Sequence, residues 1–263
     1  MGRSNMAASM ARFFALIVLA ASLCVTSLAQ VQVDPSVELA ISNFAPTIDG
    51  DVAEWKSLKE LRFGRDQIFR GAGSWRGNKD LSAKILVSWD NNRLYLAGTI
   101  FDDQTVGDEV VTPDLIDYLE LHIGSSTLDP ASRAERSVLR LFPLRPHRPW
   151  VWGGGEQDVA EGSLQPITQL AGIEVVGRRL NEGSYVFEAA IPFHHFPNLE
   201  PGTETLGFDL VLRDFDAGST AEATAMTWSK TDPFDGPRAG VLSLGAPGLL
   251  APVAVPAPLL SSE

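Results

Sequence analysis

The segment Asp117–Ile123 reads DYLELHI, and its hydrophobic and polar residues alternate strictly. Every second residue from Leu119 to Ile123 is aliphatic, whereas Glu120 and His122 fall between them. Side chains of an extended chain point alternately to opposite faces, so this period of two predicts a β-strand with one hydrophobic and one polar face. Glu120 is therefore expected on the outer face of a sheet.

The same alternation recurs over most of residues 36–245, and no long amphipathic helix is visible. Turn-forming residues at Asp90–Arg93 separate two hydrophobic runs and predict a β-hairpin. Glycine, proline, aspartate and asparagine separate the other runs. Eight to eleven strands are expected, which indicates an all-β, antiparallel β-sandwich of the immunoglobulin-like or jelly-roll type. The predicted runs are 83–89, 94–101, 117–123, 137–142, 171–178, 185–191, 206–212, 223–229 and 239–244.

The composition is that of a globular chain with an acidic surface. Of 263 residues, 44% are hydrophobic and 21% are charged, and the net charge is −12. Nucleic-acid binding needs clustered lysine and arginine, and anionic membranes attract basic segments, so this charge disfavours both kinds of partner. A neutral ligand or a cation such as calcium remains compatible with it.

Both ends of the chain are expected to lie outside the folded domain. Residues 1–29 contain two arginines and the hydrophobic run Phe13–Leu23, and they end on Ser27-Leu28-Ala29, which predicts a signal peptide cleaved near Ala29. The sandwich then spans residues 30–245, and residues 246–263 form a tail rich in proline and alanine. The protein is thus expected to be secreted or periplasmic. The single cysteine, Cys24, lies in the signal peptide, so the mature chain has no thiol and no disulfide.

Several short motifs occur in a fixed order along residues 42–244. They are Pro46–Asp51 with Glu54-Trp55, Lys84–Asp90, Leu94–Gly98 with Asp102-Asp103, Asp117–Leu121, Tyr185–Pro192, Leu206–Asp209, Thr227–Ser229 and Arg238–Gly240. Together they resemble the family 9 carbohydrate-binding modules, whose β-sandwich is related to the DOMON sugar- and haem-binding domains.

The resemblance implies a function and a set of site residues. Members of this family bind sugars without catalysing a reaction, usually accompany glycoside hydrolases in carbohydrate catabolism, and carry structural calcium. By position, Glu120 and Arg140 match the family's polar sugar-contacting pair. The two tryptophans that clamp the sugar do not carry over: their positions fall near Asp114 and near Pro233-Phe234.

Aromatic residues elsewhere are candidates for replacing the clamp. Trp150 and Trp152 lie in the glycine-rich stretch 148–155, which reads as a loop, and exposed aromatic residues on loops are typical of binding sites. Phe234 can substitute for one clamp ring, and Trp75 is a weaker candidate. Trp55, Trp89 and Trp228 are expected to pack in the core. The alternative interpretation of Glu120 and Arg140 is a solvated cross-strand salt bridge.

Acidic residues at two turns are candidates for binding calcium, which requires several convergent oxygen ligands. Asp102 and Asp103, with Asp108 and Glu109, form one acidic loop, and Asp214 and Asp216 form the other. Plain solvated loops are the alternative.

The sequence predicts a secreted carbohydrate-binding protein that captures a glycan or small sugar, in support of polysaccharide breakdown by glycoside hydrolases. No catalytic constellation is visible. Two alternatives stay open: a haem-binding electron-transfer domain of the DOMON type, which would depend on Met226 because no other methionine follows the signal peptide, and a structural envelope protein without a ligand.

Overall fold

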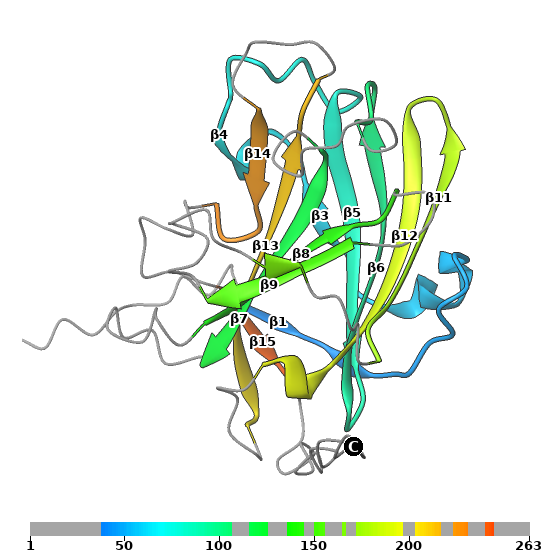
Figure 1. The fold of residues 1–263 in the computed structure, drawn as a ribbon, viewed down its shortest axis with the longest axis vertical. Coiled ribbons are helices and arrows are strands. Elements are labelled where there is room, and N and C mark those ends of the chain that lie inside the picture. Colours follow the sequence, from blue (N-terminus) through cyan, green and yellow to red (C-terminus); the bar gives the residue numbers. More distant parts are fainter. Residues whose placement is uncertain are drawn as a thin grey trace, which may run out of the picture. The chain divides into compact units, whose positions relative to one another are not determined.

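The computed structural model describes residues 38–106, 116–125, 136–144, 150–155, 165–166, 172–196, 203–216, 223–230 and 240–244. The chain divides into two units, Met1–Gln32 and Val33–Glu263, and all described residues lie in the second. This unit is a β-sandwich of two sheets, as the alternation predicted (Figure 1). The described part of the chain contains no helix with the length and hydrophobicity needed to cross a membrane.

Within the described residues, fifteen strands form the two sheets. The strands are β1 (Glu38–Ala40), β2 (Ser42–Asn43), β3 (Leu61–Phe63), β4 (Ile68–Arg70), β5 (Leu81–Trp89), β6 (Arg93–Asp102), β7 (Tyr118–Ser125), β8 (Ser137–Phe142), β9 (Trp150–Gly155), β10 (Gln165–Pro166), β11 (Glu174–Asn181), β12 (Ser184–Pro192), β13 (Thr205–Asp214), β14 (Thr224–Thr227) and β15 (Gly240–Ser243). Three 3₁₀ helices, η2 (Val52–Ser57), η3 (Arg65–Gln67) and η6 (Phe193–His195), connect them. The number of strands exceeds the predicted eight to eleven because several, such as β2 and β10, have only two residues.

The sheets contain nine and six strands. Sheet A has the order β1-β15-β13-β7-β8-β9-β10, with β14 paired to β13 and β4 paired to β14. Sheet B has the order β11-β12-β6-β5-β2, with β3 paired to β5. Most pairs are antiparallel, and the two short N-terminal strands β1 and β2 add parallel pairs with β15 and β5. The predicted hairpin is present as β5 and β6.

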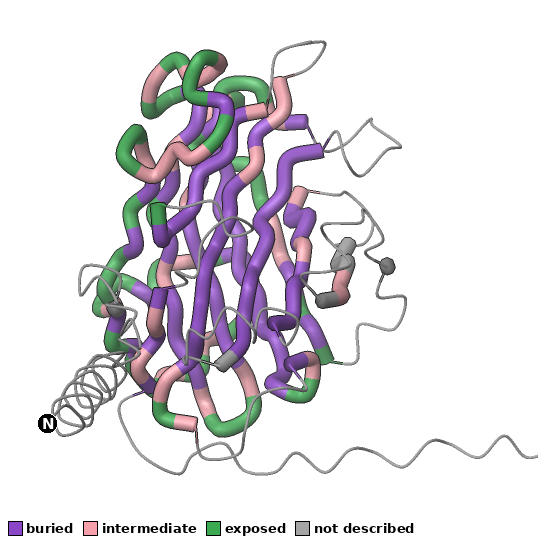
Figure 2. Tube along the Cα trace, turned by 90° about the vertical axis from the view of Figure 1, so that its left-hand side faces the viewer, coloured by how far each residue is buried: buried purple, intermediate pink, exposed green. Residues whose placement is uncertain are grey.

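The core fills the space between the sheets. Leu119, Leu121 and Ile123 of β7 point into it together with residues such as Ile85 and Val87 of β5, and all five are at most 2% exposed. The long inner strands such as β12 and β13 are buried along most of their length, and exposed residues gather at the turns and on edge strands such as β2 and β11 (Figure 2). This packing leaves Glu120 and His122 on the outer face of sheet A.

The buried carboxylate of Glu188 connects two of the sequence motifs, Pro46–Trp55 and Tyr185–Pro192. Glu188 on the outer face of β12 accepts hydrogen bonds from the backbone N–H groups of Asp49 and Gly50, and from Trp55 Nε1 at 2.7 Å. Gly50 has φ +84°, which favours glycine. The Pro46–Trp55 segment is thereby fixed on sheet B.

Another motif glycine allows a close approach. A Cβ atom on Gly240 would lie 2.2 Å from Trp228 Cζ3, so only glycine lets β15 pass over this indole ring. Trp228 packs edge-on against Phe208, with 5.5 Å between ring centroids. Trp55, Trp89 and Trp228 are all buried, at 0%, 1% and 9% exposure, which confirms their predicted core positions.

Candidate functional site

The ladder between β7 and β8 places Glu120 directly opposite Arg140 on the outer face of sheet A. Arg140 Nε and Nη2 donate to Glu120 Oε2 at 2.9 and 2.7 Å. The guanidinium also lies 4.3 Å from the centroid of the Tyr118 ring, within reach of a cation–π interaction. The predicted cross-strand charge pair is therefore present.

The pair is not the solvated salt bridge of the alternative interpretation. The side chains of Glu120 and Arg140 are 3% and 11% exposed. Ions removed from water need close partners, because their desolvation costs several kcal/mol. The orientation of Arg140 is therefore fixed by Glu120 and Tyr118 before any ligand arrives.

His122 extends this pair along β7. Its Nε2 lies 2.8 Å from Glu120 Oε1, so both carboxylate oxygens are hydrogen-bonded. Burial raises the pKa of Glu120, but the hydrogen bonds and charges of His122 and Arg140 outweigh it and lower the pKa from 4.5 to about 2. Glu120 is ionised at all ordinary pH values.

The lowered pKa of Glu120 makes the free energy of unfolding depend on pH in the acid range. Because the pKa of Glu120 is lower in the folded state, its stabilising contribution is complete above about pH 4.5 and is lost as the pH falls toward about 2. We expect this loss to amount to about 3 kcal/mol of unfolding free energy. Urea unfolding at pH 6 and pH 2.5 measures it: Glu120→Gln should flatten the acid slope, whereas the exposed control Glu182→Gln should keep it. Equal slopes in all three proteins would contradict the assignment.

A second buried carboxylate joins the network from β13. Asp209 stands opposite His122 in the β13–β7 ladder and is 1% exposed. It accepts hydrogen bonds from Thr227 Oγ1 at 2.8 Å, from Ser229 N at 3.1 Å and from the Ser229 hydroxyl. Burial raises the pKa of Asp209, although these donors and the charge of His122 oppose the rise. The sequence does not single out Asp209 as a site residue, and only the strand register shows that it neighbours His122.

The strand β9 brings two predicted site residues to the same ladder. Trp152 pairs with Arg140 and Trp150 pairs with Phe142 through the backbone. The prediction that residues 148–155 form a loop is wrong for Trp150–Gly155, because β8 and β10 supply hydrogen-bonding partners on both sides of this strand. The β8–β9 ladder therefore brings the backbone of Trp152 next to that of Arg140. This neighbourhood did not follow from the prediction of a loop.

The remaining candidate residues either lie outside the described residues or pack against the core. Phe234, like Asp108 and Glu109, lies outside the described residues. Trp75 is half-buried against the core and donates its Nε1–H to the carbonyl of Leu81 at 2.9 Å, which indicates a structural role. Met226, on which the haem alternative depends, is fully buried in the core between the sheets. Its sulfur is therefore occupied by packing.

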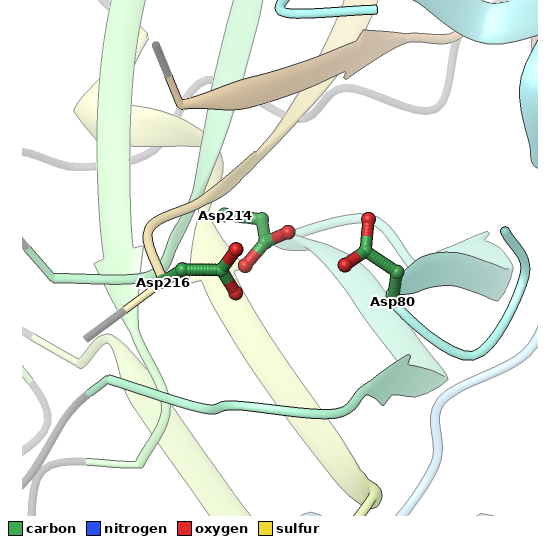
Figure 3. A group of neighbouring side chains, drawn as sticks. All are labelled: Asp80, Asp214 and Asp216. Atoms are coloured by element: carbon green, nitrogen blue, oxygen red, sulfur yellow. The ribbon is translucent and has the colours of Figure 1, made fainter. Parts of the chain in front are cut away.

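Acidic residues from four strand ends converge at one edge of the sandwich. Ligand atoms within 4.8 Å of one another belong to two groups that share Asp214: Asp80, Asp214 and Asp216, and Asp102, Asp117 and Asp214. Figure 3 shows the first group, with the carboxyl group of Asp214 between those of Asp80 and Asp216. Of the predicted calcium residues, Asp102, Asp214 and Asp216 are thus brought together. Asp103 belongs to neither group; it is exposed, 3.8 Å from Arg76.

Burial and mutual repulsion raise the pKa values of these carboxyl groups. Burial is the largest cause for Asp214, followed by the charges of Asp102 and Asp216, and the pKa rises to about 8. Burial also raises the pKa of Asp102, to about 6, and that of Asp117 well above its ordinary value. The edge therefore holds more negative charge than buried carboxylates tolerate without protons or a cation.

The oxygens in this group fit a hard cation. Arg76 hydrogen-bonds the outer oxygens, with Nε 3.0 Å from Asp80 Oδ1 and Nη2 2.8 Å from Asp216 Oδ2. Within the described part of the chain, Asp214 Oδ1 and Asp216 Oδ1 are buried and have no hydrogen-bond partner. Buried carboxylate oxygens without a donor are the ligands that a metal ion would satisfy. These clusters could thus hold a metal ion.

Comparisons with known proteins identify the fold class. No family model matches the sequence, and no curated protein sequence matches it significantly. Among solved structures, the chain resembles a family 9 carbohydrate-binding module from Caldicellulosiruptor kristjanssonii in complex with glucose, with a TM-score of 0.52 and 17% identity over 79% of this chain and 95% of that one. A complex of such a module from the same organism with cellotriose gives 0.51 and 18% identity, over 79% and 93%.

A third structure supports the same fold. It is a protein from Bacteroides uniformis ATCC 8492 that is provisionally described as carbohydrate-binding, with a TM-score of 0.53 and 12% identity over 79% of this chain and 98% of that one. These likenesses confirm the β-sandwich and its resemblance to family 9 carbohydrate-binding modules.

Proposed function

We propose that this chain is a non-catalytic carbohydrate-binding protein whose site is built on Glu120 and Arg140 of sheet A. The observation that carries the proposal is the buried ion pair between these residues, in which Arg140 Nε and Nη2 both donate to Glu120 Oε2 and the guanidinium is fixed on the sheet face. A sugar offers hydroxyl groups that accept from arginine and donate to carboxylates, and a fixed pair of this kind discriminates between hydroxyl orientations. The shared fold with modules captured with glucose and cellotriose supports this assignment.

The apolar side of the site is assigned to the tryptophans of β9. A sugar ring has an apolar face that packs on an aromatic ring, and Trp152 holds the ladder position beside Arg140. Phe234 is the third aromatic residue assigned to the site, from its sequence position alone.

Tryptophan fluorescence during titration with glucose, cellotriose and xylo-oligosaccharides tests the proposal. We expect saturable quenching by at least one of them, and we expect Trp152→Ala to weaken that binding at least about tenfold, as loss of a stacking ring in a buried site does. Trp75→Phe is the matched control, because its indole lies against the core and should leave the affinity unchanged. A protein that responds to none of these sugars would remove the proposal and favour a ligand-free structural role.

Calcium and location complete the proposed function. The carboxylates around Asp214 would hold calcium, which supplies positive charge and ties strand ends from both sheets together.

We place the mature protein outside the cytoplasm after cleavage near Ala29, where glycoside hydrolases that release soluble sugars would be its partners. Cleavage is checked by the N-terminal sequence of the exported protein, which should begin at Gln30.

A further inference from the structure

The outer face of sheet B is covered on one half and open on the other. Trp55 of η2 packs on Tyr95, Ala97 and Ala190, and residues of the 44–58 segment complete this cover. The half toward β3 and the end of β6 has no such cover among the described residues, and Phe101 there is 37% exposed. A phenyl ring is thus presented to solvent on an otherwise polar surface.

One row of residues crosses this open half perpendicular to the strands. The ladders align Arg62 of β3 with Lys84 of β5, Lys84 with Thr99 of β6, Thr99 with Val186 of β12, and Val186 with Arg178 of β11. Arg62, Lys84 and Arg178 are exposed, so every charge in the row is positive. Arg178, at the far end of the row, donates to the carbonyl of Gly50 at 3.0 Å and so lies against the covering segment. At roughly 4.8 Å between strands, the row spans about 19 Å.

A groove of about 390 Å³ runs beside this row, between the β3–η3 segment and strands β5 and β6. Its lining includes the cations Arg62, Arg65 and Lys84, the hydrogen-bonding residues Asn78 and Ser82, and the ring of Phe101. Asp66 is the acidic member of the lining, and Arg62 pairs with Glu60 at 2.9 Å. Neither Arg65 nor Lys84 has an ion pair with any described residue.

We propose that this groove binds an anionic polysaccharide, through carboxylate or sulfate groups on Arg65 and Lys84 and through a sugar ring on Phe101. Cations beside an exposed ring and uncharged hydrogen-bonding groups match a polymer that carries both charge and hydroxyl groups. The row across the sheet gives a linear chain a path that does not involve Glu120 or Arg140, which lie on the other sheet. The groove is thus a second site, independent of the proposed neutral-sugar site.

The charges favour a glycan over a nucleic acid or a membrane. Nucleic-acid binding neutralises many closely spaced phosphates, whereas the lining of the groove offers three cations, one of which is already paired with Glu60. The net charge of −12 opposes approach to an extended anionic surface. At about 0.1 M salt, screening limits that repulsion to about 10 Å, so an anionic glycan can still dock on the local cations and pack a sugar ring on Phe101.

Isothermal titration of the purified protein with polygalacturonate and with dextran sulfate, at about 0.1 M salt, tests the proposal. We expect binding to at least one of them, and no binding to fully methyl-esterified polygalacturonate, in which the carboxylates are blocked. Arg65→Ala/Lys84→Ala should weaken binding at least about tenfold. Lys56→Ala/Lys59→Ala removes the same charge from exposed positions outside the groove and should change the affinity less than about twofold.

Each other outcome overturns the proposal. Absence of binding to both polyanions, equal binding of the methyl ester, or equal loss in the two double variants would each do so. Tighter binding of single-stranded DNA with the same dependence on Lys84 would assign the groove to nucleic acid instead. Arg65→Ala/Lys84→Ala should leave the binding of neutral sugars unchanged, so failure of the groove and failure of the neutral-sugar site are distinguishable.

Discussion

We expect calcium to raise the midpoint temperature of thermal unfolding, and we expect Asp214→Asn to abolish most of the gain. At a calcium concentration about a hundredfold above the dissociation constant, binding adds about 2.7 kcal/mol, which corresponds to roughly 5–10 °C in a domain of this size. Asp214 is the carboxylate shared by both acidic groups, so its replacement removes a ligand from each. Differential scanning calorimetry with millimolar calcium and with EDTA measures the effect.

The stability of Asp214→Asn in EDTA distinguishes the loss of a metal site from damage to the fold. Because burial and the charges of Asp102 and Asp216 raise the pKa of Asp214 to about 8, its carboxyl group is mostly protonated at pH 7 without calcium, so the neutral amide should leave the stability in EDTA close to that of the wild type. Asp66→Asn, at an exposed position outside both groups, should keep the full response to calcium. An unchanged calcium response in Asp214→Asn would mean that the ion binds elsewhere.

Local patterns predicted the strands well because each strand buries one face. The hydrophobic run 137–142 coincides with β8, and the turn predicted at Asp90–Arg93 joins β5 to β6, with Arg93 as the first residue of β6. The Glu120–Arg140 contact was also predictable, because an outward-facing acid and an outward-facing base lay on adjacent strands. The sequence was sufficient to predict features that depend on a single strand or on two neighbouring strands.

The features that were missed depend on which distant strand ends meet. Asp80 precedes β5 and Asp117 precedes β7, and neither stands in an acidic run, yet the sheet topology brings both to Asp214. Asp103 was included because it follows Asp102 in sequence, but the alternation of an extended chain separates adjacent side chains. Trp150–Gly155 was read as a loop because glycine weakens strand propensity, which pairing with β8 and β10 overrides.

Arg140→Met should remove neutral-sugar binding and lower the unfolding free energy by about 3–5 kcal/mol, the range measured when one partner of a buried ion pair is deleted. The carboxylate of Glu120 would then keep only His122 as a partner in a buried site. Arg93→Met is the matched control, because Arg93 pairs with Glu174 at the surface, with side chains 33% and 51% exposed, and such pairs contribute less than about 1 kcal/mol.

A second replacement separates stability from recognition. Glu120→Gln/Arg140→Met removes both charges, so it should recover part of the stability that Arg140→Met loses, because no uncompensated buried charge remains. Sugar binding should stay absent, since the donors of Arg140 and the acceptors of a carboxylate are both missing. Chemical unfolding measures the stability, and fluorescence titration measures the sugar affinity, of the wild type, Arg140→Met, Arg93→Met and Glu120→Gln/Arg140→Met. If the double variant regained sugar affinity together with stability, Arg140 would only support the fold, and the sugar contacts would lie elsewhere on the molecule.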